Sequence, residues 1–202
     1  GSKRHKNVIL EEVNGKPPLL DDFIEPLRLK GQGGQAKNLY NSYVYFIRWA
    51  IWKACEQNSN QTGIVSYITS SSYLRGPGFA GMREYMRKVF DEIWVIDLGG
   101  EGRGARKEEN VFSIQTPVAI FVGIQHPTTA NGTPKKNSDR NRQKAAIYYQ
   151  RIRGTRAEKL GYMKHIEAPT PKHHPGWKKL PPAGWGDKFV PSSAAALSDG
   201  LP

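Results

Sequence analysis

Blocks of apolar residues separated by polar ones predict the secondary structure of the first two thirds of the chain. The apolar stretch 42–56 is long enough for a helix and indicates a largely buried one. Short apolar runs at 63–69 and 93–98, and a β-branched run at 117–124, predict three strands. Between the first two runs, apolar side chains recur at helical spacing and predict a helix over 79–90, with Phe79, Met82, Met86, Val89 and Phe90 on its buried face.

The order of these elements predicts how the strands run. A crossover helix joins the strands 63–69 and 93–98, so we expect them to be parallel and paired. A glycine-rich loop without helical pattern, 99–104, precedes the strand 117–124, which predicts an antiparallel hairpin with the second strand. The fold class expected from the pattern is α/β.

Phe112 is an aromatic residue in a polar loop directly before the strand 117–124. A strand that is buried on both faces is a rigid platform. An aromatic ring at the beginning of such a strand could stack on a flat ligand such as a nucleobase. On this segment alone, a place in the core is the simpler interpretation of Phe112.

The order and spacing of several segments resemble those of a known family. They are residues 41–46, 67–74, 82–85, 95–99, 111–112 and 116–120. Together they resemble the second half of the catalytic domain of DNA adenine amino-methyltransferases from restriction–modification systems, and they are most similar to the single-chain type ISP enzymes. The resemblance covers about residues 36–125, and segments 149–160 and 182–185 look like the extension of the type ISP enzymes.

The resemblance implies a fold and a division of the chain. The fold is the second half of a Rossmann-like methyltransferase sheet with a C-terminal antiparallel hairpin, followed by a basic, Pro/Gly-rich extension. Residues 1–35 are then a linker and polar loop that opens with a tag-cleavage scar, Gly1-Ser2. Residues 36–125 form the methyltransferase half-domain, and 126–202 the extension leading to a target-recognition region.

The resemblance also implies an activity and site residues. The parent protein would transfer a methyl group from S-adenosylmethionine to the N6 amino group of adenine in DNA. Phe112 falls where an aromatic stacks on the extruded target base, and this role and a core role stay open. Phe46, with Tyr43, falls beside the cofactor adenine, although packing alone explains Phe46 in so apolar a helix.

The motifs that perform methyl transfer in the resembled family are missing. The family uses an Asn/Asp-Pro-Pro-Tyr/Phe motif and a glycine-rich cofactor loop, whereas this chain has Lys16-Pro17-Pro18-Leu19. Its Gly31-Gln32-Gly33-Gly34 follows a charged stretch instead of a strand, so a linker explains it better. We therefore expect no catalytic residue here, a fragment that is inactive alone, and a partner in the remainder of the same polypeptide.

The charge of the chain predicts a polyanionic partner. Its formal net charge is +12, and cations crowd the stretch 135–159. DNA is the expected partner, because basic side chains release counterions from phosphates. The residues predicted to contact it are Lys135, Lys136, Arg140, Arg142, Arg151 and Arg153; for 135–144 a solvated loop explains the charge equally well.

The extension contains two further predicted elements. Residues 145–152 read as a strand, on which Arg151 and Arg153 would share one face. Thr155 and Glu158 form a capping box for a short helix through about residue 166. From Pro169 onward prolines and glycines dominate, and Trp177 and Trp185 are expected to anchor the tail on a neighbouring surface.

Other tempting groups have simpler explanations. Asp97, with Glu101, reads as a turn former at the end of a strand. Ser70-Ser71-Ser72 lacks a nearby histidine base. A single cysteine, Cys55, and the adjacent pair His173 and His174 offer no metal site. With a single cysteine there is no disulfide framework, so we expect a reducing cytoplasm. No apolar run approaches the roughly 20 residues that span a bilayer.

Two alternatives to the methyltransferase interpretation remain. One is a non-enzymatic basic DNA- or RNA-binding module, whose aromatics Tyr148, Tyr149 and Trp177 could stack on unpaired bases. The other is a structural half-domain that completes the sheet of a partner through an exposed edge.

Overall fold

The computed structural model describes residues 7–57, 61–100, 108–127, 145–166, 176–181 and 184–192. The helices are α1 (Asp21–Leu29), α2 (Ser42–Ile51), α3 (Ser72–Arg75), α4 (Ala80–Val89) and α6 (Arg156–Lys164). Three short helical segments accompany them: η1 (Gly33–Leu39), η2 (Trp52–Glu56) and η3 (Pro77–Phe79). The strands are β1 (Gly63–Ser70), β2 (Glu92–Gly99), β3 (Val118–Gln125), β4 (Ala146–Arg151) and β5 (Lys178–Lys179).

The strands form one mixed sheet in the order β1-β3-β2-β4-β5. The predicted antiparallel pairing of β3 with β2 is confirmed, as is the α/β fold class. The predicted direct pairing of β1 with β2 is wrong, because β3 lies between them and is antiparallel to both. The connection through α4 therefore joins two strands, β1 and β2, that are not neighbours, and β3 lies between them. β1, β2 and β4 run in the same direction.

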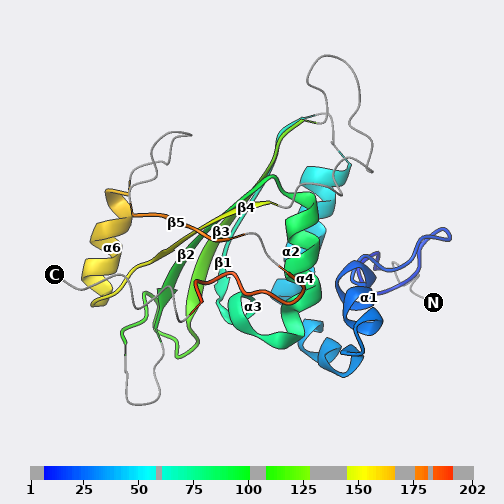
Figure 1. Ribbon diagram of the computed structural model, residues 1–202, viewed down its shortest axis with the longest axis horizontal. Helices are drawn as coiled ribbons and strands as arrows, with labels where there is room; N and C mark the ends of the chain where they lie inside the picture. Colours follow the sequence, from blue (N-terminus) through cyan, green and yellow to red (C-terminus); the bar gives the residue numbers. More distant parts are fainter. Residues whose placement is uncertain are drawn as a thin grey trace, which may run out of the picture.

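Helices α2 and α4 pack on one face of the sheet, with α1 outside them (Figure 1). The core between helices and sheet is made of fully buried side chains, including Ile47 and Met86 from the helices and Val95 and Phe121 from the strands. A smaller apolar cluster joins α6 to the other face of the sheet: Leu98, Val111, Val118 and Ile152, with Met163 against them.

Helix α2 is amphipathic, which corrects the expectation of a largely buried helix. It begins after Asn41, whose side chain caps the helix by accepting a hydrogen bond from the Tyr43 N–H. Val44 and Ile47 are fully buried, but Phe46 is 60% exposed and Trp49 is 42% exposed. The predicted core role of Phe46 is therefore wrong.

Helix α1 lies within residues 1–35, where the sequence indicated only a linker and polar loop. It buries Phe23, Ile24 and Leu27 against the other helices, so this part of the expectation is corrected. Arg48 of α2 fixes α1 in place. Its buried guanidinium donates to the Leu19 carbonyl at 2.9 Å and to the Asp22 carboxylate.

The segment 184–192 is held against the helices by buried arginine. Arg83 of α4 donates to the carbonyls of Gly186 (3.0 Å) and Asp187 (2.9 Å), about a hundred residues away. Burial, together with the nearby Arg87, lowers the pKa of Arg83 to about 10. Phe189 is fully buried under Arg87.

Both tryptophans of the extension anchor it as predicted. Trp177 meets Trp94 edge to face, and Trp185 packs against the main core. The predicted strand over 145–152 and the capping box of Thr155 with Glu158 are also confirmed.

Candidate functional site

The carboxyl ends of β1, β2 and β4 meet at one edge of the sheet, and a loop that carries Phe112 returns to this edge before β3. In open α/β sheets ligands bind outside the carboxyl ends of the strands. Three structural features converge here: the Phe112 loop, a buried carboxylate with its cations, and the first turns of α6. This edge is the candidate site.

Asn110 organises the loop that presents Phe112. Its side-chain oxygen accepts the Phe112 N–H at 3.0 Å, and its amide nitrogen donates to the Thr116 carbonyl at 2.7 Å. One residue thereby closes the loop on itself. The Phe112 side chain is 45% exposed, so the interpretation of Phe112 as a core aromatic is wrong.

Two glycines at the end of β2 make room for this loop. Gly99 and Gly100 have φ angles of +59° and +93°, a region that residues with a Cβ rarely adopt. A Cβ on Gly100 would lie 2.6 Å from Cγ of Asn110. The glycine pair therefore ends the strand and also seats the residue that positions Phe112.

Asp97 is the centre of a buried ion-pair cluster directly beneath the loop. Its carboxylate is 0% exposed and accepts hydrogen bonds from Arg75 (2.7 Å), Arg151 (2.7 Å) and the Tyr149 hydroxyl (2.9 Å). It also accepts the Gly99 N–H at 3.1 Å. The interpretation of Asp97 as only a turn former is wrong. Its partner in that interpretation, Glu101, lies outside the described residues.

The two arginines keep Asp97 ionised. Burial by itself would raise the pKa of this carboxyl, but Arg151 and then Arg75 outweigh it and hold the pKa below its ordinary value. One feature of the sequence indicates that the Asp97 side chain is buried. Asp97 has the same strand parity as the core residues Ile93 and Val95, so its side chain had to face the interior.

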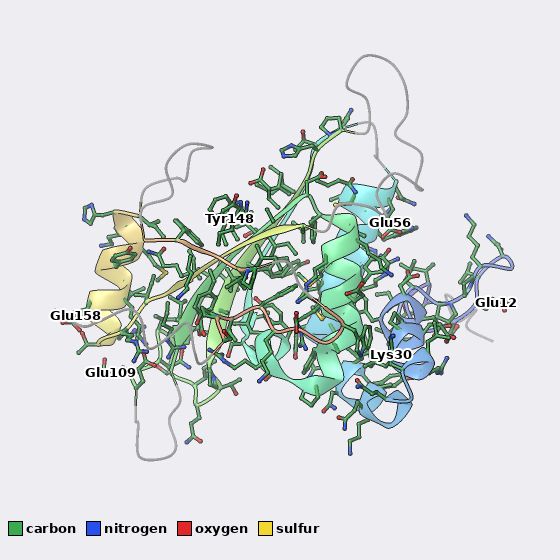
Figure 2. All side chains as sticks on the ribbon, viewed as in Figure 1. Glu12, Lys30, Glu56, Glu109, Tyr148 and Glu158 are labelled. Atoms are coloured by element: carbon green, nitrogen blue, oxygen red, sulfur yellow. The ribbon has the colours of Figure 1, made fainter. Side chains whose placement is uncertain are left out.

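Lys159 of α6 connects the extension to the Phe112 loop. Its fully buried ammonium donates to the carbonyls of Leu98 (2.6 Å) and Glu109 (2.7 Å) and lies 2.8 Å from a carboxylate oxygen of Glu108. The Arg156 N–H donates to Glu109 at 2.6 Å, and Figure 2 shows Glu109 beside the first turn of α6. Residues 108–110 are therefore held from both sides, by β2 and by α6.

The prediction that Arg151 and Arg153 share one face of a strand is wrong, because only Arg151 belongs to the strand. β4 ends at Arg151, whose side chain points into the cluster and pairs with Asp97 and Glu108. Arg153 lies beyond the strand and is exposed. Arg151 is thus engaged within the protein, and its predicted contact with DNA stays a prediction. Lys135, Lys136, Arg140 and Arg142 lie outside the described residues.

The residues predicted near a cofactor lie along α2, beside β1. Tyr43 is half-buried, stacks on Phe79 and shares a hydrogen bond with Ser70 at the carboxyl end of β1. Burial raises the pKa of Tyr43 to about 12, although the Ser70 hydrogen bond opposes this. Phe46 lies about one helical turn further on, where its carbonyl accepts from Tyr67. Tyr43 therefore reaches the candidate edge, and Phe46 presents an exposed ring next to β1.

The described residues contain neither a metal-binding group of side chains nor a membrane-spanning helix. Across 7–57, 61–100 and the later described segments, no group of three or more His, Cys, Asp or Glu residues could hold a metal ion. No helix within those segments is long and apolar enough to cross a membrane. His173 and His174 fall outside the described part of the chain.

Comparison with known proteins identifies structures with a similar fold. No family model and no curated protein matches the chain. Among solved structures, the type ISP restriction–modification enzyme LlaBIII bound to DNA matches 87% of this chain at 20% identity, with a TM-score of 0.59. A nuclease-deletion mutant of the type ISP enzyme LlaGI, in complex with a DNA substrate mimic, matches 84% at 19% identity with the same TM-score.

A third structure, the DrdV–DNA complex, matches 70% of the chain at 24% identity, with a TM-score of 0.51. At these identities the likeness shows the fold. The chain spans only 11% of LlaBIII, 15% of LlaGI and 12% of DrdV.

Proposed function

We propose that this chain is part of a DNA adenine-N6 methyltransferase within a restriction–modification enzyme, and that it supplies the contact to the extruded target base. The observation that carries the proposal is the exposed ring of Phe112, held at the carboxyl edge of the sheet by Asn110. The similar structures support the proposal, because they are restriction–modification enzymes or DNA complexes of the same fold.

Phe112 suits a flat, uncharged ligand. Enzymes that modify a base take it out of the duplex, at a cost of a few kcal/mol that stacking on an aromatic side chain partly offsets. S-adenosylmethionine would supply the methyl group in the complete enzyme. The role of this chain is to hold the base: Asn110 and the glycine pair fix the loop, so little conformational freedom is lost when a base stacks on Phe112.

The open edge of the sheet fits a chain that works with the rest of a larger polypeptide. β1 pairs with β3 on one side, and among the described residues it has no strand partner on the other. It carries no proline or charged residue, which edge strands use to prevent pairing. Exposed apolar side chains flank it: Phe46 and Trp49 from α2, and Ile64 and Ile68 from β1 itself. We infer that further strands of the same polypeptide continue the sheet at β1.

The described residues fit S-adenosylmethionine only in part. Phe46 offers an exposed ring to the cofactor adenine, and Tyr43 stands near the strand end. The sequence lacks both the glycine-rich cofactor loop and the Pro-Pro-aromatic motif of the resembled family. We therefore expect isothermal titration calorimetry of this chain to give a dissociation constant weaker than micromolar. Micromolar binding that disappears in Phe46→Ala would show that the main cofactor site lies within this chain.

Phe112→Ala is the direct test of the proposed function. Loss of stacking should weaken binding of the chain to a duplex with one unpaired adenine by about 1–3 kcal/mol. Binding to the matched duplex with an abasic position should change little. The dependence of binding on salt should stay the same, because no phosphate contact is lost. In the polypeptide that contains this chain, methylation should slow.

Ile114→Ala provides the matched control. Ile114 is 50% exposed in the same loop but has no aromatic face. Equal effects of the two substitutions on adenine binding would contradict the stacking role. They would favour a structural half-domain, in which the loop makes only apolar contacts with a partner.

The structure gives no support to the non-enzymatic binding module. The aromatics that the module would use are occupied within the protein. Tyr148 stacks on Trp94 at 3.9 Å between ring centroids, Tyr149 donates to Asp97, and Trp177 meets Trp94.

A further inference from the structure

Among the described residues, the cluster around Asp97 holds more cations than carboxylates. Two carboxylates, Asp97 and Glu108, face three cations: Arg75, Arg151 and Lys159. If all are ionised, the cluster retains one positive charge. In a buried cluster an excess charge is costly unless it reaches water or a ligand.

Of the three cations, Arg75 is the most exposed. Arg151 uses both of its terminal nitrogens, one on Asp97 and one on Glu108, and Lys159 is enclosed by acceptors. Arg75 differs, because its side chain is 45% exposed and one terminal nitrogen, Nη2, donates to Asp97. A guanidinium has five N–H donors. Among the described residues, its guanidinium bonds to Asp97 and Tyr149, and part of the side chain is open to solvent.

Arg75 and the Phe112 loop belong to the same edge. Arg75 ends α3, which follows directly from β1, and the Ser71 N–H donates at 2.9 Å to the carbonyl of Pro117 at the end of the Phe112 loop. On the other side, Asp97 accepts the Gly99 N–H, and Gly100 accepts a hydrogen bond from Asn110. A continuous series of contacts thus joins the Arg75 guanidinium to the residue that positions Phe112.

We propose that Arg75 binds a backbone phosphate of the nucleic acid whose base stacks on Phe112, with Asp97 as the residue that orients it. This rests on the proposed function and adds a contact to it. A planar guanidinium matches the oxygens of a phosphate better than an ammonium does. Because the buried Asp97 fixes one side of the guanidinium, the other side is held in place before a phosphate arrives.

The test is the salt dependence of binding to the duplex with one unpaired adenine. Arg75→Gln removes the charge and keeps a polar side chain. It should weaken binding on every sequence and reduce the slope of log K against log salt by about 0.7–0.9, the release expected for one phosphate. Arg75→Lys keeps the charge and should retain the slope of the unmodified chain. Thermal unfolding of each variant checks that the fold is intact.

Arg28→Gln is the matched control, since it removes the same charge from a comparably exposed side chain on α1. A slope for Arg75→Gln equal to that of the unmodified chain or of Arg28→Gln would overturn the phosphate contact. A lowered slope in Arg75→Lys as well would also overturn it, because the charge is still present there. Failure of the proposed function is a separate result: Phe112→Ala would then leave adenine binding unchanged.

Discussion

Asp97→Asn is expected to lower the free energy of unfolding by about 3 kcal/mol at neutral pH. Removing one partner of a buried ion pair leaves its counter-charges without compensation, at a typical cost of about 3–5 kcal/mol. We place the effect at the lower end of that range, because Arg75 can turn toward water. Urea denaturation of the two proteins measures the difference.

The cost of this substitution should depend on pH in one direction. The pKa of Asp97 is lower in the folded chain than in the unfolded one, so its contribution to stability is present above the unfolded pKa. The difference between the unmodified chain and Asp97→Asn should stay constant from about pH 7 to 5, since the unfolded pKa is near 3.9. Below about pH 4 it should shrink, because the unfolded chain then binds a proton on Asp97 that the folded chain does not.

Glu25→Gln supplies the control for Asp97→Asn. It also removes one carboxylate that faces an arginine, but the pair of Glu25 with Arg28 is exposed on both sides. Exposed pairs contribute about 0–1 kcal/mol. If Asp97→Asn and Glu25→Gln lowered the free energy of unfolding by similarly small amounts, Asp97 would not be the centre of a stabilising ion-pair cluster.

Lys159→Met is expected to destabilise the chain by about 3 kcal/mol and to loosen the Phe112 loop. Methionine fills similar space, but the carbonyls of Leu98 and Glu109 lose a buried donor and Glu108 loses a counter-charge. Denaturant unfolding measures the stability. Hydrogen exchange of the 108–112 amides should rise well beyond what the lower global stability explains.

Lys164→Met separates this effect from a loss of charge in α6. Lys164 is on the same helix and is exposed. Its replacement should leave stability within about 0.5 kcal/mol and loop exchange unchanged. If Lys159→Met loosened all segments equally, α6 would be a part of the common core and not a specific support for Phe112.

The coupling between α6 and the Phe112 loop gives the extension a direct role at the candidate edge. The sequence predicts residues 126–202 to be an extension that follows the half-domain. In the structure, the strand β4 extends the sheet and α6 holds residues 108–110 through Lys159 and Arg156. Extension and half-domain are therefore one structural unit at the site.

The order of strands shows a limit of reasoning from sequence. Apolar periodicity located β1, β2 and β3 to within one or two residues, because burial of a strand depends on its own side chains. It could not place β3 between the other two. A crossover helix fixes the direction of the strands it joins, but the number of strands between them depends on which backbone edges meet in the folded sheet.

The buried arginines show a second limit. Arg48 and Arg83 are buried although the sequence gives no reason to bury a charge in their helices, and the sequence does not predict α1, which Arg48 holds. Their acceptors come from distant segments, such as the carbonyls of Gly186 and Asp187 for Arg83. A charge can be buried only where the fold brings such acceptors together.

What the sequence determined by itself is the set of local elements: the strands β1, β2, β3 and β4, the helices α2, α4 and α6, the capping box of Thr155 with Glu158, and an aromatic residue in the loop before β3. These depend on neighbours a few residues apart. Only the tertiary structure decided that Phe112 is exposed, that Phe46 is on the surface, and that Arg151 faces Asp97. The physical reason is that exposure and ion pairing depend on which distant groups occupy the same volume, and residues 97, 110 and 159 meet only after β2, the Phe112 loop and α6 have packed together.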